Sequence, residues 1–457
     1  MDYPQFFKLS ESDIIYPTAI SLDGRDSIGT GRASKLSLKY EPENANSLND
    51  VFWSSSNEDV AIVDEKGMVT GVSVGNATIT AKTKSRNAYL ETSYDVEIRE
   101  QVLDSWTIMI YMCGSNLESG SGLASADIAE ILKVSGQPDD VNIILETGGT
   151  TYWHRYGIDA NALSRYHVEN KQLVLDQKLP KVNMGQQSTF ESFLTWGLQE
   201  YPAEKTGVIL WNHGGALGGC CYDDSTGWYS DSLVASETAS AYNNVFTANS
   251  VSKLEFVGYD ACLMQVQDIA DFNAPYFNYM IGSEETENGE GWAYSSWIDD
   301  VYDGADTRTI LKANCDGFIS YYGLSCDQTL SYLDLSKMNN YREKFEAMAA
   351  AIKSTAKANW SAFKSIISKT YSYYGFSSYG LIDGLDFLDK LDANASYDAF
   401  DNEIAAAKAA YNELVGYSKC GTGAGASHGL AIVAATSSNC SYPSSETHFN
   451  NWRSIFK

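Results

Sequence analysis

The chain has 457 residues, of which 44% are hydrophobic and 12% aromatic; this excludes a disordered protein and predicts two or three domains. The formal net charge of −27 disfavours nucleic acid and anionic membranes as partners and favours basic ones, although the same charge also fits simple solubility.

The eight cysteines form no C-x-x-C pair and the five histidines lie far apart, so the spacing typical of zinc sites is absent. The cysteines are also too sparse for a disulfide scaffold. No run of residues is long and apolar enough to span a membrane. The first residues, MDYPQFFKLSESD, have neither the basic nor the apolar segment of a signal peptide, and a targeting segment outside this sequence is one explanation.

Residues 1–17 show no periodicity and are predicted to be a leader or linker. Between residues 18 and 99, apolar and polar residues alternate, as at Leu36, Leu38 and Tyr40, which predicts half-buried antiparallel strands. The segment 65–67 separates two such runs, 60–63 and 68–72, and is predicted to be a hairpin turn. Short strands at this spacing predict an all-β sandwich over 18–99.

The segment 52–81 carries a more specific pattern, FWSSSNEDVAIVDEKGMVTGVSVGNATITA. It closely resembles the bacterial immunoglobulin-like domain of group 2, whose signature combines W-S-S-S-N-x-x-V-A-x-V, an x-G-x-V-T-G turn and G-x-A-x-I-T-A. The resemblance implies an immunoglobulin-like sandwich of the kind found in surface and secreted bacterial proteins. We expect a spacer, with glycan or protein binding as the alternative.

A short linker at 100–105 precedes a change of pattern. Apolar strand-like runs then alternate with helical patterns, which predicts a second domain at 106–457 with an α/β/α sandwich and a mainly parallel sheet. Strands are expected at 106–112, 141–146, 208–211, 254–259, 279–282 and 428–435, with a hairpin formed by 163–168 and 171–175. Helices are expected at 123–132, 190–198, 232–246, 266–272, 338–356 and 401–414.

Two of these strands end in residues that can perform chemistry. The run 208–211 is followed by His213 and two glycines, and the run 254–259 by Asp260 and Cys262. Because the C-terminal ends of parallel strands line the ligand crevice of an open sheet, we expect His213 and Cys262 to meet there. A lone Cys or His is more often structural, but their order and separation match the roughly 50 residues between the two in caspases.

Such a pair supports nucleophilic catalysis by a thiolate, with Cys262 as nucleophile and His213 as general base. The backbone amides of Gly214 and Cys262 are the candidate oxyanion hole, since a glycine lets the backbone approach a substrate closely. Asp260 shares a strand face with Cys262, so its carboxylate is a candidate for pairing with a basic substrate side chain. An Asp at this position also fits a helix cap.

An acidic loop follows the strand at 279–282. Its glutamates are candidates for the same basic-residue pocket, with Glu290 as first choice, or for a calcium site, while a solvated loop fits equally well. No metal-ligand set can be assigned from the sequence. The four glutamates of this loop are Glu284, Glu285, Glu287 and Glu290.

The vicinal Cys220 and Cys221 are interpreted as structural.

The blocks WNHGG at 211–215 and GYDACLM at 258–264 look like the active-site signatures of the clostripain family of cysteine peptidases. Three further blocks agree in order: WTIMIYMCGSNLE at 106–118, GSEETENGEGW at 282–292 and HGLAIVAA at 428–435. The resemblance implies a caspase-like fold and cleavage after Arg or Lys through a thioester, with His213 as base, Cys262 as nucleophile and Asp260 as the specificity carboxylate. It also implies a secreted, cell-surface or periplasmic bacterial enzyme that needs no cofactor for its chemistry, although calcium supports some relatives.

The sequence departs from the family pattern in informative places. The usual third glycine after the histidine is Ala216, and the last strand lacks its Tyr-Phe-Pro ending. Residues 214–252 contain no Lys or Arg, whereas some family members mature by cleavage after a basic residue there. We therefore expect a monomeric single-chain enzyme, or activation elsewhere. The alternatives are an inactive peptidase fold used for binding or adhesion, and a thiol-dependent amidase or transpeptidase.

Overall fold

The computed structural model describes residues 14–24, 26–86, 88–100, 103–225, 231–374, 380–434 and 446–457. The chain divides into two compact units, Met1–Leu103 and Asp104–Lys457, each with its own hydrophobic core. The predicted linker coincides with this boundary, because the last strand of the first unit ends at Arg99 and the next begins at Asp104. Most of the predicted leader lies outside the described residues.

The smaller unit is a sandwich of short strands, as the alternating pattern predicts. β1 pairs with β4, the order β2-β9-β8-β5 makes a four-stranded sheet, and β3-β7-β6 makes a three-stranded one. The strands are β1 (Ala19–Asp23), β2 (Ser27–Gly29), β3 (Ala33–Lys35), β4 (Ser37–Glu41), β5 (Val51–Ser55), β6 (Ala61–Val63), β7 (Met68–Gly71), β8 (Gly75–Ser85) and β9 (Ala88–Arg99).

The core of this unit follows from the period of two. On β8, Ala77 and Ile79 are buried and their immediate neighbours are more exposed, because successive strand residues point to opposite faces. The two side chains pack with Val69 of β7 and Ile98 of β9. One apolar face per strand is therefore enough to close the sandwich.

The predicted turn at 65–67 joins β6 and β7 as an antiparallel hairpin. The carboxylate of Asp64 accepts backbone hydrogen bonds from Lys66 and Met68, both at 2.8 Å. Gly67 has a φ of 81°, a left-handed conformation that favours glycine. Local side-chain chemistry thus fixes this turn.

The larger unit is built on a nine-stranded sheet, with the order β13-β12-β11-β10-β14-β15-β16-β17-β19. Its five central strands are parallel, and an antiparallel pair flanks them at each edge. The strands are β10 (Asp104–Cys113), β11 (Val141–Gly148), β12 (Ala162–Glu169), β13 (Gln172–Pro180), β14 (Ala203–Trp211), β15 (Leu254–Asp260), β16 (Phe277–Gly282), β17 (Thr329–Asp334) and β19 (Val415–Cys420).

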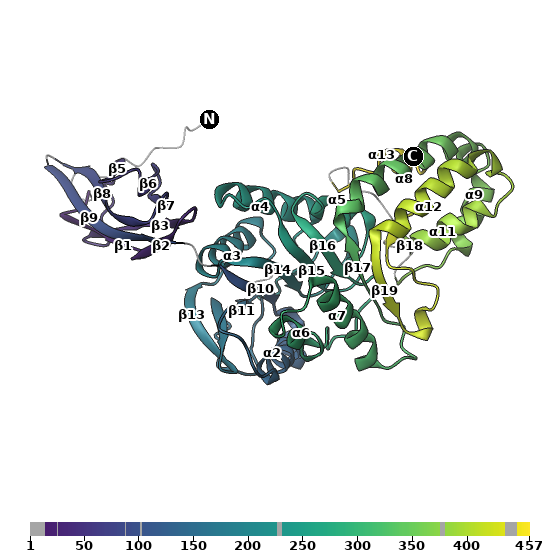
Figure 1. The fold of residues 1–457 in the computed structure, drawn as a ribbon, viewed down its shortest axis with the longest axis horizontal. Helices are drawn as coiled ribbons and strands as arrows, with labels where there is room; N and C mark the ends of the chain where they lie inside the picture. The colour runs from purple at the N-terminus through teal and green to yellow at the C-terminus, as the bar shows by residue number, and fades with distance from the viewer. Residues whose placement is uncertain are drawn as a thin grey trace, which may run out of the picture. The chain divides into compact units, whose positions relative to one another are not determined.

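Helices cover both faces of this sheet, which explains why its central strands are apolar throughout. On β10, Met109 and Tyr111 face the core below α3, α4 and α5, whereas Ile108 and Ile110 face the core beside α2, α6 and α7. Figure 1 shows the two helical layers on opposite sides of the strands. These helices are α2 (Leu123–Lys133), α3 (Gln187–Glu200), α4 (Ala235–Ala248), α5 (Gln267–Asn273), α6 (Ile298–Tyr302) and α7 (Thr307–Tyr322); the short α1 spans Ser115–Ser121.

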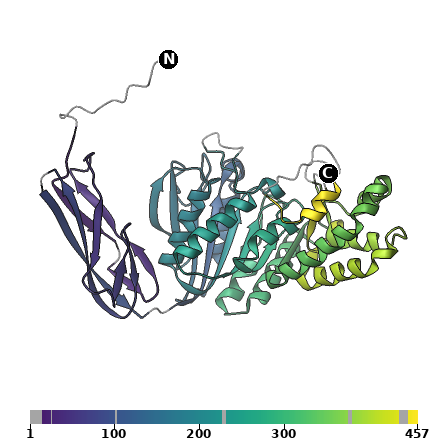
Figure 2. The same ribbon diagram turned by 90° about the horizontal axis from the view of Figure 1, so that it is seen from above.

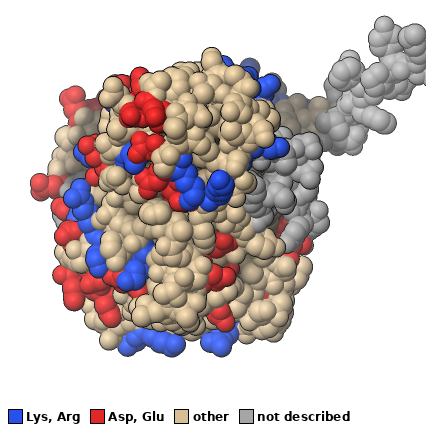
Figure 3. All heavy atoms as spheres, turned by 90° about the vertical axis from the view of Figure 1, so that its right-hand side faces the viewer, with Lys and Arg blue, Asp and Glu red and all other residues tan. Residues whose placement is uncertain are grey.

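The C-terminal third adds a helical layer at one end of the sheet, drawn in green to yellow in Figure 2. Its elements are α8 (Met338–Ala358), α9 (Trp360–Lys369), α11 (Gly384–Asp392), α12 (Asp401–Leu414) and α13 (Asn450–Ile455), with strands β18 (Leu381–Asp383) and β20 (Ala431–Val433). The face of this layer in Figure 3 mixes both signs of charge. Within the same layer, Lys408 pairs with Asp389 and Asp392 at 2.8 and 2.9 Å. Exposed ion pairs of this kind add little to the free energy of unfolding. Neither positive nor negative residues cover this face alone.

The predicted elements of the larger unit are present, but one strand differs and several further elements were not predicted. The strand expected at 428–435 is shorter, and it pairs with β18 in a separate two-stranded sheet rather than in the main one; residue 435 lies outside the described residues. The strands β17, β18 and β19 and the helices α1, α6, α7 and α13 were not predicted. β19 is the edge strand and β17 lies beside it, and the mixed polar and apolar sequence of both gives a weak periodic signal.

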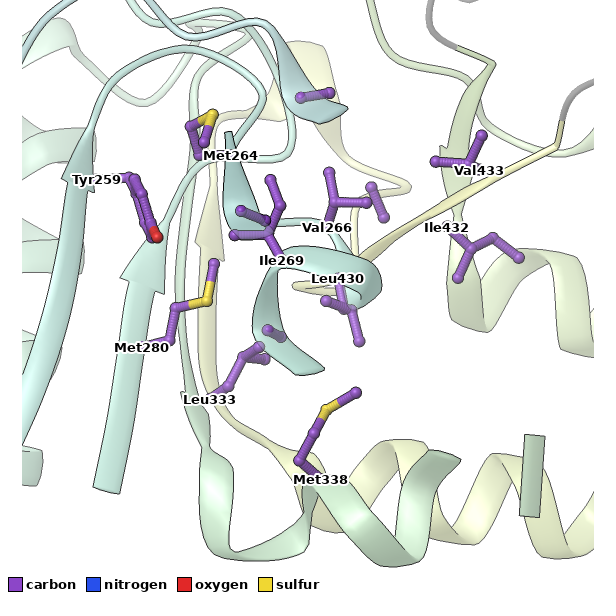
Figure 4. Close-up of a cluster of buried hydrophobic side chains, with 14 of the residues drawn as sticks. Tyr259, Met264, Val266, Ile269, Met280, Leu333, Met338, Leu430, Ile432 and Val433 are labelled. Atoms are coloured by element: carbon purple, nitrogen blue, oxygen red, sulfur yellow. The ribbon is translucent and has the colours of Figure 1, made fainter. Parts of the chain in front are cut away.

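The turn that follows β15 is held by apolar packing on the α5 side of the sheet. Figure 4 shows Met264, Val266 and Ile269 facing Met280 of β16 and Leu430 from the segment before β20. All of these side chains are at least 98% buried. Segments far apart in sequence therefore fix the residues that immediately follow Cys262.

A buried carboxyl ties the loop after β16 to the C-terminal layer. Glu284 Oε1 accepts hydrogen bonds from the Gly429 amide (2.6 Å), the Ser427 hydroxyl (2.9 Å) and the Tyr373 hydroxyl (3.1 Å). Burial raises the pKa of Glu284 to about 7, and the nearby charge of Asp383 acts in the same direction. The folded state therefore retains a proton that the unfolded chain releases near its ordinary pKa.

This proton predicts how stability depends on pH. Between the ordinary pKa of a Glu and about 7, the folded protein binds more protons at Glu284 than the unfolded chain does, so its contribution to the free energy of unfolding falls as pH rises. In Glu284→Gln this slope should be smaller by up to about 1.4 kcal/mol per pH unit. Urea unfolding followed by tryptophan fluorescence measures it, since all tryptophans except Trp53 lie in the larger unit. Glu290→Gln, in the same loop but exposed, is the control, and an equal slope in both variants would contradict the assignment.

Candidate active site

The two strands expected to deliver the histidine and the cysteine are neighbours. β14 and β15 pair in parallel, with Trp211 opposite Asp260, so the segments that follow the two strands leave the sheet at the same edge. The Asn212 amide donates to the Asp260 carbonyl at 3.2 Å, which extends the pairing by one residue. His213 and Cys262 then line one cavity of about 200 Å³. The crevice predicted from strand direction is therefore present.

Two asparagines hold the histidine in place. The side chain of Asn212 donates to the Cys113 carbonyl at 2.6 Å and accepts from the Tyr222 amide at 2.7 Å, so it joins the loops after β10 and β14. The ring Nε2 of His213 lies 2.7 Å from Oδ1 of Asn116, which belongs to α1. Neither asparagine was predicted to be functional, although both stand inside the blocks at 106–118 and 211–215 that carry the family resemblance.

The contact with Asn116 assigns the protonation of the ring. An amide oxygen accepts hydrogen bonds, so Nε2 of His213 carries the hydrogen and Nδ1 keeps a free lone pair. Burial lowers the pKa of His213 below its ordinary value, which favours the neutral ring near pH 7. A neutral imidazole with a fixed tautomer is what a general base requires.

Backbone amides surround the sulfur of Cys262. The Glu287 amide donates to Sγ at 3.3 Å, and the thiol lies 3.7 Å from the Glu287 carbonyl oxygen. Burial raises the pKa of Cys262 to about 11 and the Glu287 carboxyl adds to this, while the amides of Glu287, Cys262 and Gly214 lower it. The resting group is therefore a thiol, which needs a base before it can attack. The two amides predicted as the oxyanion hole, those of Gly214 and Cys262, both lie at this sulfur.

Gly214 lies against the backbone of Cys262. A Cβ built at this position would overlap the carbonyl oxygen of Cys262. Only a residue without a side chain allows the loop after β14 to approach the turn after β15 so closely. The sequence predicted a close approach of this glycine to a substrate, and the close approach that the structure shows is to the backbone of Cys262.

The turn after Cys262 is strained and clamped. Leu263 has a φ of 64°, a left-handed conformation that is uncommon for a side chain of this size. The loop after β16 holds the turn, since the Leu263 amide donates to the Glu285 carbonyl at 3.0 Å and the Gln265 amide donates to the Ser283 carbonyl at 2.9 Å. Strain maintained by surrounding contacts is typical of functional turns.

Asp260 lines the cavity together with His213 and Cys262, as predicted from the shared strand face. Only 3% of the residue is exposed, and its carboxylate accepts from the Tyr294 hydroxyl at 2.9 Å and the Trp292 amide at 3.2 Å. Burial raises the pKa of Asp260 to about 7, although these two hydrogen bonds lower it. The alternative role as a helix cap is not observed, because α5 begins only at Gln267.

The structure corrects the position assigned to Glu290. The Gly291 amide donates to the Asn288 carbonyl at 3.0 Å, which closes a tight turn, so Glu290 lies at an exposed corner and does not line the cavity. Glu287, three residues earlier, lines it instead. The sequence marks the whole loop as acidic but does not show where this turn falls.

The other residues singled out from the sequence have structural surroundings. Cys220 and Cys221 are fully buried, and Cys220 exchanges two backbone hydrogen bonds with Leu233. Among the described residues, no group of three or more His, Cys, Asp or Glu side chains is arranged to hold a metal ion.

A comparison with protein-family models matches residues 110–454 to the model described as the clostripain family, and residues 18–91 to that of the bacterial Ig-like domain (group 2). The chain belongs to the clostripain family. Both resemblances proposed from short sequence blocks are thus confirmed. The larger unit of this clostripain-family protein has the α/β/α architecture expected of it.

Solved structures agree on the fold of this clostripain-family protein. An inactive zymogen C11 protease from Parabacteroides distasonis is 19% identical with a TM-score of 0.58, covering 78% of this chain and 96% of that one. A secreted C11 cysteine protease from Bacteroides thetaiotaomicron is 15% identical with a TM-score of 0.56, covering 78% of this chain and 100% of that one. At such low identity the likeness shows the fold alone.

Among curated proteins the matches are short. An alpha-L-arabinofuranosidase from Bifidobacterium longum is 38% identical over 92 residues, which is 19% of this chain and 8% of that enzyme. The chain spans less than a tenth of the length of this relative. Among the described residues, no helix is long and apolar enough to cross a membrane.

The contact at Gly214 predicts the effect of adding one methyl group. Gly214→Ala must displace the Cys262 turn, which should reduce the free energy of unfolding by about 1–3 kcal/mol. It should also change the rate at which iodoacetamide modifies Cys262, measured by peptide mass mapping. Gly218→Ala is the matched control, since its Cβ would meet only the Tyr222 hydroxyl at 3.4 Å. Equal behaviour of the two variants would show that the close approach is not required.

Proposed function

We propose that this chain is a cysteine endopeptidase that cleaves peptide bonds after Arg or Lys. The observation that carries the proposal is one small cavity lined by a thiol, an imidazole and a buried carboxyl, those of Cys262, His213 and Asp260. The first two provide a nucleophile and a base, and the third provides a reason for a cationic substrate side chain to enter. Membership of a cysteine peptidase family supports the same chemistry.

Acylation begins when Nδ1 of His213 takes the proton from the Cys262 thiol and Sγ attacks the carbonyl carbon of the scissile bond. The carbonyl oxygen becomes an oxyanion, and the Gly214 and Cys262 amides donate to it. The C–N bond then breaks, and the leaving amine takes the proton from His213. The product is a thioester on Cys262, with the proton count unchanged.

Deacylation reuses the same groups. Neutral His213 takes a proton from a water molecule, whose oxygen attacks the thioester carbonyl carbon. The C–S bond breaks, the proton returns to the sulfur, and a carboxylic acid leaves. Asn116 keeps Nε2 of His213 hydrogen-bonded through both halves, so the same ring nitrogen, Nδ1, exchanges the proton each time.

The selectivity assigned to Asp260 rests on its burial. A carboxylate removed from water attracts a cation more strongly than an exposed one, because the surrounding medium screens less. An Arg or Lys side chain that enters the cavity gains a charge-assisted hydrogen bond, whereas a neutral side chain leaves the carboxyl without a cation.

We further propose that the enzyme acts outside the cytoplasm as a monomer, with the immunoglobulin-like unit as a spacer and protein or peptide substrates as its partners. The Ig-like module and the secreted relative support export. The chemistry above uses only protein side chains and water, so no cofactor takes part in any step; calcium enters as one condition of the test below.

Turnover by single-residue variants tests the proposal. We expect wild type to cleave fluorogenic peptides with Arg or Lys before the scissile bond, to leave Asp and Leu peptides intact, and to act with or without calcium. Cys262→Ala should lose at least about a hundredfold of the activity, since the nucleophile is absent. No cleavage of any peptide would favour a binding or adhesion role. Cleavage with preferred transfer to added amines would favour a transpeptidase.

The raised pKa of Asp260 predicts a dependence on pH. Asp260 attracts a cation only when ionised, so kcat/KM for an Arg peptide should rise as pH rises through about 7. Titration of His213 should not contribute to this rise of kcat/KM, because burial lowers its pKa below the ordinary value. Asp260→Asn should lower kcat/KM for the Arg peptide by an amount equivalent to about 2 kcal/mol or more of transition-state stabilisation. It should also remove the rise of kcat/KM with pH. If Asp260→Asn keeps both the rise of kcat/KM with pH and the preference for Arg, Asp260 is excluded from the pocket.

A further inference from the structure

The smaller unit has a cavity that is flanked by two sheet edges. Among the described strands, β5 ends the four-stranded sheet and pairs only with β8, and β6 ends the three-stranded sheet and pairs only with β7. Both strands contribute to the wall of one cavity of about 450 Å³. The strand residues in this wall are Val51, Phe52 and Trp53 of β5 and Val63 of β6.

The register of β5 shows which of its backbone groups are free. In an antiparallel pair, residues that exchange hydrogen bonds alternate with residues whose N–H and C=O groups point away from the partner strand. Directly after β5, the Ser56 amide donates to the Thr78 carbonyl at 2.9 Å. Counted back along the regular register, this places the N–H and C=O groups of Val51 and Trp53 on the side away from β8. Both residues line the cavity.

The register of β6 gives the same result on the opposite side. Directly after β6, the Asp64 amide donates to the Met68 carbonyl at 3.0 Å. The backbone groups of the preceding residue, Val63, therefore point away from β7. Since Val63 also belongs to the wall, the cavity is flanked on both sides by backbone groups that the two sheets leave unpaired.

The charged side chains of the cavity wall are all acidic. They are Asp50, Asp64 and Glu65, and all three are exposed; no Lys or Arg of the described chain belongs to this wall. Phe52 adds an apolar surface beside the edge, because 65% of it is exposed. The cavity therefore combines free backbone groups, negative charge and one exposed aromatic ring.

We propose that this cavity is a docking groove that takes an extended, cationic segment of a partner protein as an added β-strand. A segment that lies along β5 can exchange up to about four backbone hydrogen bonds, two with Val51 and two with Trp53. Its Lys or Arg side chains meet the acids of the wall, and an apolar side chain meets Phe52. This role is additional to the spacing proposed above, and it does not depend on the peptidase chemistry because it concerns the smaller unit alone.

The same acids argue against a second copy of this chain as the occupant. Edge-to-edge pairing of two copies would bring two sets of like charges together across adjacent strands, which is unfavourable. Charged residues at a free edge are a common protection of natural sheets against self-association. The net charge of −27 adds to this repulsion between copies, whereas it attracts a cationic segment.

The first test measures binding of a defined peptide to the full chain. Every arm carries Cys262→Ala, so that a proposed peptidase cannot cleave the probe. We expect fluorescein-labelled Lys-Val-Lys-Val-Lys-Val to bind saturably by fluorescence anisotropy, and binding to weaken as salt is added. The acidic counterpart Glu-Val-Glu-Val-Glu-Val should not bind. A cationic peptide methylated at every backbone nitrogen keeps its charge but lacks the N–H donors, so it should lose at least about tenfold in affinity.

Substitutions in the groove locate the binding. Glu65→Lys should weaken binding of the cationic peptide roughly three- to tenfold, while Glu43→Lys, an equal change at an exposed residue outside the wall, should leave it unchanged. Val51→Pro should weaken it at least about tenfold, because it removes an outward N–H without breaking the pairing with β8. Circular dichroism checks that each variant is folded, and Glu65→Lys decides the question if Val51→Pro is not.

Three results would overturn the proposal. The first is equal affinity of Glu65→Lys and Glu43→Lys, which would place the peptide elsewhere on the chain. The second is full binding of the methylated peptide, which would show attraction by charge without strand addition. The third is a dimer of the chain in sedimentation velocity that Val51→Pro abolishes, because the occupant of the groove would then be a second copy.

Discussion

The parallel pairing of β14 with β15 is the constraint on which the site depends. Because the two strands point the same way and lie side by side, the residues that follow them, His213 and Cys262, must emerge at one edge of the sheet. Gly214 then lies against the Cys262 backbone, where a side chain would not fit. Any register shift between these strands would separate His213 from Cys262, since strand geometry moves every following residue by about 3.3 Å.

The same edge also collects acids that are removed from water. Trp211 donates its indole hydrogen to Asp127 at 2.6 Å, and burial followed by the charge of Asp260 raises the pKa of Asp127. Carboxyls held in this way cost stability, because desolvation disfavours their ionised forms. A fold that retains several buried carboxyls near one another therefore gives up part of its stability. Such a trade is a common feature of functional sites.

The sequence located the site more accurately than it located the residues that complete it. His213, Gly214, Asp260 and Cys262 could be assigned because they directly follow two strongly apolar strands, whose direction fixes where they end. Glu290 was the wrong choice within the acidic loop, because a turn closed by a backbone hydrogen bond from Gly291 decides which acid faces inward. Asn116 could not be assigned from periodicity, since it approaches His213 from a helix far away in the sequence.

By itself, the sequence predicted the division into two units, the type of each fold, and the placement of His213 and Cys262 at one edge of the sheet. These properties follow from local signals: strand and helix periods, glycines, and chemical groups placed at strand ends. The tertiary structure alone decided which partners those groups meet. The unpaired carboxyl of Glu287, the raised pKa of Asp260 and the fixed tautomer of His213 all arise from burial and from contacts between distant segments. Desolvation and hydrogen bonding depend on what surrounds a group in space, and a linear pattern does not record those surroundings.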